Sequence, residues 1–505
     1  MIEIVVGSRL RLRREDLPDG VEDELRAGFT HDNPQYAALI SMGLKAWKEP
    51  RKLMTWTVDG PDLVLSRGGM WRLRNVLVRN RLDWTVRDER TEGNEKLAGH
   101  IPGLRVALRD YQEEMVQAAI ERENCLLRAP TGSGKTVAAL GLISRIGLPS
   151  LVVVWNGALL RQWCDRAKCD LGVSGDMLGL VQGSTRRIRP LTLAMQQTLW
   201  RIRGPEWEWI DRQFGVVVAD EVQRCPARTV MDVFNRLSAR YRIGISASER
   251  RKDRKEFLTY DVFGKVAAEI EQDELIERGV VHDVEVRVVP TDFLDEAYAA
   301  RRESYAEAKA EGGEAETPDF RELLDHLEVD EQRNERGMRL ALAEVAEGRS
   351  VIMLSHRRDH CRRFCQMAAS AGVRSGLLLG GVEDASEFER CVRELRSGEL
   401  KFAAGTIQAI GQGIDLPAVS RGIVMTPVAG NKFLWGQVRG RMCRRAEGKV
   451  DAAVYYLLDV PTVGLGHLAN LCAWNARVVV LDGTMADGRD WLREERKRQK
   501  EASGG

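Results

Sequence analysis

The segment from Ala129 to Thr136 carries the residue types that hold a phosphate group. Gly132 and Gly134 let backbone N–H groups approach phosphate oxygens closely, while Lys135 and Thr136 add an ammonium and a hydroxyl. The segment follows a short apolar run and opens a helical pattern, and a helix N-terminus attracts anions. We therefore expect Lys135 to contact the β- and γ-phosphates of ATP and the Thr136 hydroxyl to bind Mg²⁺.

A carboxylate pair, Asp220 and Glu221, follows a second apolar run, Val216–Ala219. Two carboxylates at the end of a buried strand suit metal binding and water activation. An isolated acidic pair is typical of a solvated strand end. The position of this pair after a phosphate loop favours a role in metal binding and catalysis instead. We expect Asp220 to bind Mg²⁺ and Glu221 to orient or deprotonate the attacking water.

A third group, Gln437 to Arg445, is rich in arginine. Arg441 and Arg444 are three residues apart, which places them on one face of an expected helix. Guanidinium groups stabilise the charge on a transferring phosphoryl group. On its own this segment is typical of a solvated basic helix. Because the phosphate loop belongs to another domain, we expect the arginines to complete a site in a cleft that nucleotide closes.

The elements that must position these residues form two series of short apolar runs. The first series is 125–127, 151–154, 216–219 and 243–245, and the second is 351–354, 376–379, 402–404, 422–425 and 454–458. Helical stretches separate the runs, which is typical of buried parallel strands in an α/β fold. We expect two tandem α/β domains, at 101–280 and 281–485.

Residues 1–100 have a different pattern. Gly60-Pro61 separates two apolar runs that read as strands, and residues 71–81 combine four arginines and no acid with near-helical apolar spacing. We expect a small N-terminal α/β domain with one basic helix.

Composition sets broad limits on function. The 505 residues include 76 Lys and Arg against 75 Asp and Glu, for a net charge of +1, which argues against a polycationic nucleic-acid binder. Residues 291–330 hold 13 acidic and 4 basic residues, so we expect a solvated, partly helical insertion there. We expect residues 486–505, with Arg496–Lys500, to form a frayed basic tail.

The sequence predicts a cytoplasmic protein that does not enter a membrane. No basic segment followed by a long apolar stretch opens the chain, and the nine cysteines are too sparse for a disulfide framework. His356, His360, Cys361 and Cys365 have plausible ligand spacing, but four ligands on one helix point around its axis and cannot easily surround zinc. We expect the cysteines in the core and the histidines at the surface or in a cleft.

The order of these segments resembles that of the superfamily 2 helicases. The matching motifs across residues 108–445 are Leu108–Gln112, the phosphate loop, Leu159–Trp163, Thr192–Gln197, Asp220–Gln223, Tyr241–Asp253, Ser355–Arg357, Gly405–Pro417 and Gln437–Arg445. Within the superfamily, Gln162-Trp163, the charged run Glu249–Asp253 and the stretch Leu63–Arg90 resemble the phage UvsW-type branch-migration and annealing helicases, which are related to the XPB group.

The resemblance implies two RecA-like parallel-sheet domains, ATP and Mg²⁺ as cofactors, and roles for further residues. The implied nucleotide contacts are Arg109, Gln112 (to the base), Pro130, Thr131, Gly132, Ser133, Gly134, Lys135, Thr136, Gly413 and Asp415, with Gln437 joining the catalytic arginines. The implied coupling residues are Gln223, Ser246 and Ser248. Implied DNA contacts are Arg161, Gln162, Trp163, Gln196, Ser355, Arg357 and Thr406, to which the basic helix adds Arg72, Arg74 and Arg79. Trp163 at a helix start could equally be a core residue.

Some positions depart from the helicase pattern. Gln223 ends the aspartate box in place of the usual His or Asp, and Ser248 and Glu249 replace the usual Thr and Pro. Gln223 and Ser248 keep hydrogen-bonding groups, so coupling can survive. Trp155-Asn156-Gly157 replaces the usual Pro-Thr and changes the backbone contacts expected there.

The resulting hypothesis is an ATP-dependent DNA translocase that unwinds, anneals or branch-migrates DNA in replication, recombination or repair. DNA would be its partner, with other replication or recombination proteins as further candidates, and we expect a monomer. Two alternatives stay open: an ATP-gated nucleic-acid-binding module without unwinding, and an RNA helicase. A restriction-type motor subunit is disfavoured because the chain carries no recognised nuclease motif.

Overall fold

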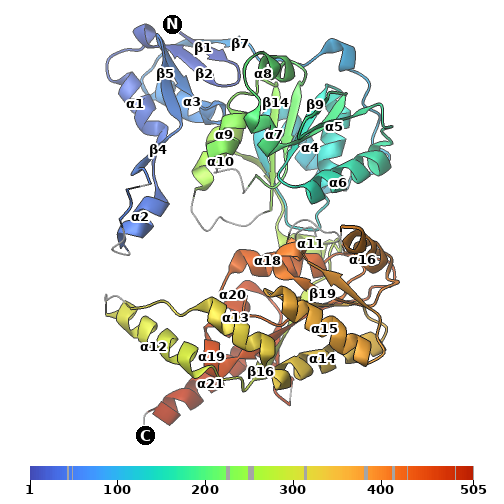
Figure 1. The fold of residues 1–505 in the computed structure, drawn as a ribbon. Coiled ribbons are helices and arrows are strands. Elements are labelled where there is room, and N and C mark those ends of the chain that lie inside the picture. The colour runs from blue at the N-terminus through green and yellow to red at the C-terminus, as the bar shows by residue number, and fades with distance from the viewer. Residues whose placement is uncertain are drawn as a thin grey trace. The chain divides into compact units, whose positions relative to one another are not determined.

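The computed structural model describes residues 1–41, 45–47, 49–222, 228–247, 255–311, 315–379, 385–411, 416–428, 430–483 and 485–503. Contacts divide the chain into two compact units, Met1–Glu274 and Leu275–Gly505. Figure 1 shows that each unit has its own sheet and covering helices.

The first unit begins with a small α/β domain. Its described residues form a five-stranded sheet in the order β5-β6-β2-β1-β7. The strands are β1 (Ile2–Val6), β2 (Leu10–Arg13), β5 (Trp56–Asp59), β6 (Asp62–Leu65) and β7 (Trp84–Asp88), the helices are α1 (Val21–Gly28) and α3 (Met70–Arg79), and a lateral hairpin of β3 (Thr30–Asp32) and β4 (Lys52–Met54) carries α2 (Pro34–Ser41). Leu25 of α1 and Leu73 and Leu77 of α3 pack with Ile4 and Leu63 in one core. The predicted basic helix is therefore α3, whose apolar side covers the sheet.

The second part of this unit is a large sheet in the order β11-β10-β12-β9-β13-β14-β8-β15 among the described residues. Its strands are β8 (Asn124–Arg128), β9 (Ser150–Val154), β10 (Leu178–Gln182), β11 (Thr185–Arg187), β12 (Leu191–Met195), β13 (Val216–Ala219), β14 (Tyr241–Ser246) and β15 (Val266–Glu269). Its helices are α4 (Asp110–Arg122), α5 (Lys135–Ile146), α6 (Gly157–Arg166), α7 (Gln196–Arg201), α8 (Gly204–Asp211), α9 (Arg228–Phe234), α10 (Glu256–Phe263) and α11 (Gln272–Glu277). All these strands except β11 are parallel to their neighbours, and β9, β12 and β13 are buried throughout.

Asp261 of α10 joins the small domain to the large sheet. Its carboxylate is fully buried and accepts hydrogen bonds from Arg72, from the Thr55 hydroxyl at 2.6 Å, and from His31, whose Nε2 lies 2.7 Å away. Arg72 was predicted to contact DNA, and this assignment needs correction. Its side chain is 15% exposed and forms an internal ion pair, because a buried carboxylate requires a cation.

The second unit has its own large sheet, ordered β18-β19-β17-β20-β21-β16-β22-β23 in the described residues. Its strands are β16 (Val284–Thr291), β17 (Val351–Ser355), β18 (Ser375–Leu378), β19 (Phe402–Thr406), β20 (Arg421–Val424), β21 (Ala452–Asp459), β22 (Val478–Leu481) and β23 (Met485–Asp487). Its helices are α12 (Glu296–Ala310), α13 (Phe320–Val329), α14 (Glu331–Ala346), α15 (Arg358–Ser370), α16 (Ala385–Ser397), α17 (Ile407–Gly411), α18 (Lys432–Met442), α19 (Val460–Val463), α20 (Gly466–Trp474) and α21 (Gly488–Ser503). Only β23 is antiparallel among these strands. The predicted fold class is confirmed.

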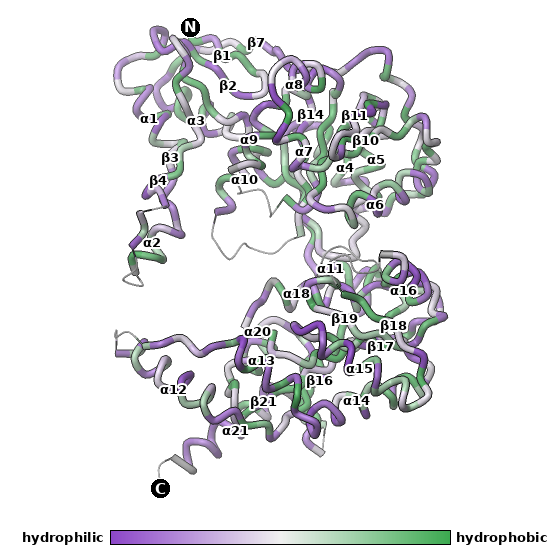
Figure 2. Tube along the Cα trace, viewed as in Figure 1, coloured by the Kyte–Doolittle hydropathy of each residue, from purple (hydrophilic) through white to green (hydrophobic). Residues whose placement is uncertain are grey.

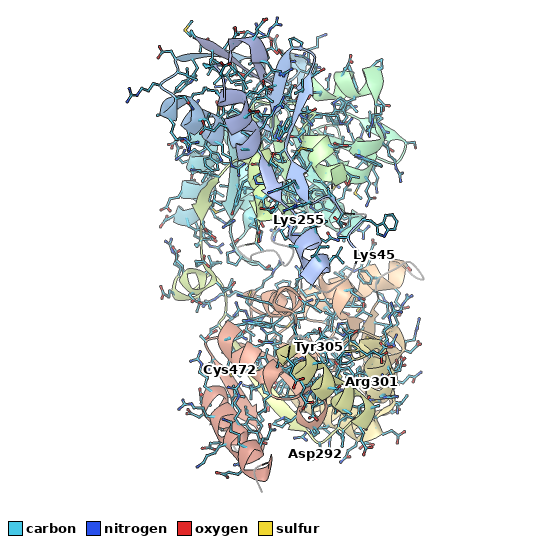
Figure 3. The ribbon with its side chains drawn as sticks, turned by 90° about the vertical axis from the view of Figure 1, so that its left-hand side faces the viewer. Lys45, Lys255, Asp292, Arg301, Tyr305 and Cys472 are labelled. Carbon is cyan, nitrogen blue, oxygen red and sulfur yellow. The ribbon has the colours of Figure 1, made fainter. Side chains whose placement is uncertain are left out.

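The acidic segment 291–330 is more ordered than its charge suggests. Figure 3 labels Arg301 and Tyr305 on α12, and Arg301 Nη1 donates to Glu322 of α13 at 2.7 Å. Leu323, Leu324 and Leu327 of α13 are buried in a small cluster. The prediction of a solvated, partly helical segment holds for α12, whose surface is mostly exposed. Helix α13 differs, because its buried leucines pack within the unit.

The C-terminal residues form helix α21, where the sequence predicts a frayed tail. Leu492 is buried, and contacts with α20 and β22 fix the first half of the helix. Its second half is almost wholly polar (Figure 2). Within the described part of the chain, no helix combines the length and apolar character needed to span a bilayer.

Candidate nucleotide-binding site

Five neighbouring strands of the first large sheet end at the same edge, and the predicted motifs follow them. In sheet order the strands are β12, β9, β13, β14 and β8, and they lead into Gln196, Trp155, Asp220, Ser246 and Ala129. Because parallel strands share a carboxyl edge, segments far apart in sequence converge there. Ligands of open α/β sheets bind at this edge.

The phosphate loop has the backbone that its glycines predict. Gly132 and Gly134 have φ angles of 92° and 79°, in the left-handed region that favours glycine. A Cβ on Gly134 would lie 2.5 Å from Gln112 Nε2, so no side chain fits without displacing that amide. Helix α5 begins at Lys135, whose Nζ donates to the carbonyl oxygens of Ala129 at 2.8 Å and Pro130 at 3.2 Å. The ammonium is thus held against the loop that would surround a phosphate.

Two side chains from the start of α4 brace this loop. The Tyr111 hydroxyl and Gln112 Nε2 both donate to the Ser133 carbonyl oxygen, Gln112 at 2.9 Å. Gln112 Oε1 accepts from the Arg109 backbone N–H at 2.9 Å, and Gln112 is 2% exposed. Gln112 was predicted to read the base, and here its amide supports the loop. Arg109 is exposed beside it.

Asp220 is buried and held by two tryptophans. Trp163 Nε1 donates to Asp220 Oδ2 at 2.9 Å, and Trp155 Nε1 donates to the Asp220 carbonyl oxygen. Burial and the neighbouring Glu221 carboxylate raise the Asp220 pKa to about 6. The Lys135 ammonium opposes this rise, which places the phosphate loop and the aspartate in electrostatic contact.

Glu221 occupies strained backbone. Its φ of 53° lies in the left-handed region, which non-glycine residues seldom adopt, and its N–H donates to Asp220 Oδ1 at 2.9 Å. Strained residues concentrate at functional sites. The strain is consistent with a carboxylate placed for chemistry rather than for stability.

The residues present fit a magnesium ion. Thr136 is the second residue of α5 and has a partly buried side chain. Asp220 supplies a buried carboxylate, and burial disfavours its charge unless a counter-ion is present. Hydroxyl and carboxylate oxygens are ligands that Mg²⁺ prefers. The Ser133 hydroxyl is buried without a hydrogen-bond partner among the described residues, which is consistent with a polar group being accepted at the loop.

Of the three predicted coupling residues, the structure describes Ser246. Ser246 ends β14, and its carbonyl oxygen accepts from the Ala129 N–H at 3.0 Å, which ties this motif to the phosphate loop. The other two predicted coupling residues, Gln223 and Ser248, lie outside the described residues.

The predicted DNA contacts of the first unit divide by exposure. Arg161 is exposed and Gln162 half-buried on α6, whereas Gln196 is 6% exposed. Of the two roles left open for Trp163, the core role is confirmed, because this side chain is fully buried against Asp220 and cannot stack on a base in this structure. On α3 of the small domain, Arg74 and Arg79 are exposed.

The predicted DNA contacts of the second unit lie at its carboxyl edge but are mostly internal. Ser355 and Thr406 are paired in register at the ends of β17 and β19 and are 0% and 4% exposed. Ser355 Oγ lies 3.0 Å from His360 Nδ1, and Arg357 forms an ion pair with Asp325. The Ser355 and Thr406 side chains therefore face the protein interior, which corrects their assignment as surface contacts.

The catalytic arginines of the second unit do not share one helix face as predicted. Helix α18 ends at Met442, so Arg441 lies in its last turn and is 9% exposed. Arg444 follows the helix and forms an isolated backbone bridge with Val281. Gln437 is half-buried on α18, while Gly413 and Asp415 lie outside the described residues.

The histidine and cysteine group at 356–365 follows β17 and continues into α15. No cluster of potential ligands that could hold an ion occurs in the described part of the chain. Cys361 is in the core, as expected. His360 is fully buried as well, with Nε2 2.8 Å from Asn334 Oδ1, so the prediction that it lies at the surface or in a cleft was wrong.

Trp155 supports the site, although its sequence position did not predict this role. In the sequence it stands only as a departure from the helicase pattern at the end of β9. Trp155 carries an indole N–H donor and directly follows β9, and β9 neighbours the strand that ends at Asp220. Because the sheet order brings these two strand ends together, this position was the signal from which its role could have been predicted.

Comparison with known proteins agrees with this geometry. Residues 105–251 match the family described as the type III restriction enzyme, res subunit. The chain is 29% identical over 373 residues to a Halobacterium salinarum protein named putative DNA 3'-5' helicase Rad25; the match covers 72% of this chain and 56% of the relative. The chain thus spans just over half of that relative's length.

A viral relative and a solved structure extend the comparison. The probable helicase D10 of Escherichia phage T5 is 23% identical over 367 residues, covering 72% of this chain and 74% of D10. The structure of S. cerevisiae Dbp5 bound to RNA and ADP BeF3 aligns with a TM-score of 0.52 at 12% identity, over 77% of this chain and 93% of Dbp5. At that identity the structural likeness concerns the fold alone.

Proposed function

We propose that this chain is a superfamily 2 helicase, an ATP-driven DNA helicase or translocase of the UvsW type, related to XPB, that remodels branched or annealed DNA. The observation that carries the proposal is the convergence of Lys135, Asp220 and Glu221 at one sheet edge. The order of motifs along the sequence and the named relatives support the same proposal.

In this proposal the first unit binds and activates the nucleotide. Lys135 and the loop from Pro130 to Gly134 hold the phosphates of ATP, with Arg109 at the loop's side. Thr136 and Asp220 bind Mg²⁺, which when present neutralises charge on the phosphates. Trp163 and Trp155 fix Asp220, and Glu221 accepts a proton from, or orients, the attacking water.

The second unit supplies cations to the same reaction in this proposal. Arg441 and Arg444, with Gln437, stabilise charge on the transferring phosphoryl group. Gly413 and Asp415 contact the nucleotide. The coupling residues make DNA binding depend on whether ATP is bound or hydrolysed; they are Gln223, Ser246 and Ser248. Nucleotide-driven closure and reopening then shift the grip on DNA.

The DNA contacts proposed here are polar or charged side chains that are at least partly exposed. Arg161 and Gln162 of α6 and Arg357 of the second unit follow the phosphate backbone, so sequence preference is low. Arg74 and Arg79 of α3 make the small domain a contact for duplex or branched DNA. Other replication or recombination proteins are candidate partners.

The test measures ATP hydrolysis with single-stranded, forked and four-way-junction DNA and with RNA, followed by strand displacement on the forked and four-way substrates. We expect DNA-stimulated hydrolysis, strongest with branched DNA, and a loss of at least about a hundredfold in Lys135→Ala because the phosphate contact is removed. An unchanged rate in Lys135→Ala, or the absence of stimulation by nucleic acid, contradicts the proposal. Turnover without displacement or branch migration favours an ATP-gated binding module, and stimulation by RNA alone favours an RNA helicase.

A further inference from the structure

A hollow of about 580 Å³ lies at the outer edge of the first large sheet, away from the nucleotide site. Its lining residues are Asn94, Leu97, Thr185, Arg186, Arg187, Ile188, Arg189, Trp209 and Gln213. They come from edge strand β11, from helix α8, from the segments that enter β12 and β13, and from residues 94–97 between β7 and α4. Arg187 pairs with Leu180 and Leu191 pairs with Leu178, so Arg189 lies near the amino ends of the strands, opposite the carboxyl edge.

The charge of this hollow favours an anion. Three arginines and no carboxylate line it. Arg186 is balanced by Glu206, 2.7 Å from its Nε. Arg187 and Arg189 are exposed, and within the described residues neither forms an ion pair. Two cations without counter-ions therefore remain at the rim.

The hollow also presents an aromatic ring. Trp209 of α8 is 50% exposed, unlike the neighbouring Trp207, which is 7% exposed. Gln213 fixes the backbone beneath it: its Nε2 donates to the Trp209 carbonyl oxygen at 2.9 Å, and its Oε1 accepts from Asn94 Nδ2 at 2.8 Å. When a flat group stacks on a solvent-exposed indole, little side-chain conformational entropy is lost if the indole already has a rigid support.

We propose that this hollow is a second nucleic-acid-binding site, which holds one single strand with a base on Trp209 and backbone phosphates on Arg187 and Arg189. Aromatic platforms beside cations are the general device for binding single strands without reading sequence. The inference rests on the proposed function only in taking nucleic acid as the molecule that the chain meets. Neither Arg161 nor Gln162, the contacts proposed on α6, lines the hollow.

The test measures binding of a fluorescent single-stranded oligonucleotide to the full chain without ATP, over a range of salt concentrations. We expect Arg187→Glu with Arg189→Glu to weaken binding at least about tenfold and to reduce the slope of log affinity against log salt by about 1.4, the value for two phosphate contacts on a single strand. Trp209→Ala should weaken binding about fivefold or more, and Trp209→Phe should restore most of it because a ring remains. ATP hydrolysis without DNA should be unchanged in each of these variants.

The matched control is Arg122→Glu, an exposed arginine at the end of α4, close to the start of β8 and far from β11 in the sheet order. An equal loss in this control, or unchanged affinity and salt slope in the Arg187, Arg189 and Trp209 variants, overturns the site. Unchanged binding in those variants together with normal DNA-stimulated hydrolysis refutes the site and leaves the proposed function standing. Binding that depends on Trp209 in a chain without DNA-stimulated hydrolysis supports the site and refutes the proposed function.

Discussion

At the scale of single residues, the nucleotide site depends on how Asp220 is kept ionised. The carboxylate is buried beside Glu221, and both circumstances favour its protonated form, so its pKa rises to about 6. Hydrogen bonds from Trp163 and from the Glu221 N–H, together with the Lys135 charge, oppose the rise. Trp163 therefore acts from within the core on the charge of Asp220, the proposed metal ligand.

Replacing Trp163 with Phe removes the donor while keeping an aromatic ring in the cavity. Without that hydrogen bond the Asp220 pKa should rise further, and the ionised fraction near neutral pH should fall. We expect ATP hydrolysis in Trp163→Phe to need several-fold more Mg²⁺, with a defect that grows as pH falls from about 8 to about 6, because protonated Asp220 binds no cation. Removal of the buried hydrogen bond should also cost about 1–3 kcal/mol of stability.

The measurement is a Mg²⁺ titration of hydrolysis at several pH values, with Trp84→Phe in the small domain as control. Trp84 lies at the start of β7, remote from Asp220 in the fold. A Mg²⁺ requirement that is the same in both variants at every pH would show that the Trp163 hydrogen bond does not support the metal ligand.

At the scale of elements, the apolar runs were sufficient to predict most of the parallel strands, because strands buried on both faces read as uninterrupted Val, Ile and Leu. They did not reveal β16, although it is paired with β21 along eight residues. Its sequence, VEVRVVPT, contains Glu285 and Arg287, which bind each other at 2.7 Å. The series of uninterrupted apolar runs omits this strand because Glu285 and Arg287 interrupt its apolar residues.

The site was predictable where local sequence determines geometry and not where tertiary contacts do. Gly132, Gly134 and Lys135 adopt the conformation that their own residue types impose. Arg72 was assigned to DNA, and Trp163 was left between a DNA contact and a core position, because exposure cannot be inferred from residue type. Each instead meets a buried carboxylate from a distant segment, and only the folded chain reveals that partner.

The Arg72–Asp261 contact between α3 and α10 should contribute strongly to the folding stability of the first unit. Asp261→Asn leaves Arg72 without its buried partner, and breaking a buried ion pair costs about 3–5 kcal/mol. We expect a markedly lower melting temperature and faster proteolysis of the small domain. Arg79→Met is the control, because its pair with Glu24 is exposed and should contribute less than about 1 kcal/mol. Equal melting temperatures for the two variants would contradict this role of Asp261.

This link should also weaken in acid. Burial and the nearby Arg72 charge lower the His31 pKa to about 4, below its ordinary value. The unfolded chain then binds a proton at higher pH than the folded one, so the contribution of His31 is complete above about pH 6.5 and decreases as pH falls toward about 4. Thermal unfolding of His31→Gln should depend less on pH over this interval than that of the unchanged chain. Parallel pH profiles would rule out His31 as the titrating group.

At the scale of the whole molecule, the net charge of +1 combines an acidic segment with a basic remainder. Residues 291–330 have a net charge of −9, so the rest of the chain has one of +10. The remainder includes exposed Arg74 and Arg79, whereas the acidic side chains of α12 are largely exposed to solvent. A chain with this division can bind DNA through its basic surfaces despite its near-neutral total.

We predict that the acidic segment lies away from the DNA path. Deleting residues 291–330 is unsuitable as a test because Leu323, Leu324 and Leu327 are buried. Replacing exposed Glu303, Glu307 and Glu316 with Gln changes the charge by three units without touching that cluster. Affinity for forked DNA and its dependence on salt should stay unchanged, as followed by fluorescence anisotropy.

Arg74→Gln with Arg79→Gln should instead weaken binding and reduce the salt slope by about 0.9 for each duplex phosphate that an arginine no longer neutralises. Tighter binding of the glutamine variant of the acidic segment would show that this segment repels DNA and therefore lies near its path.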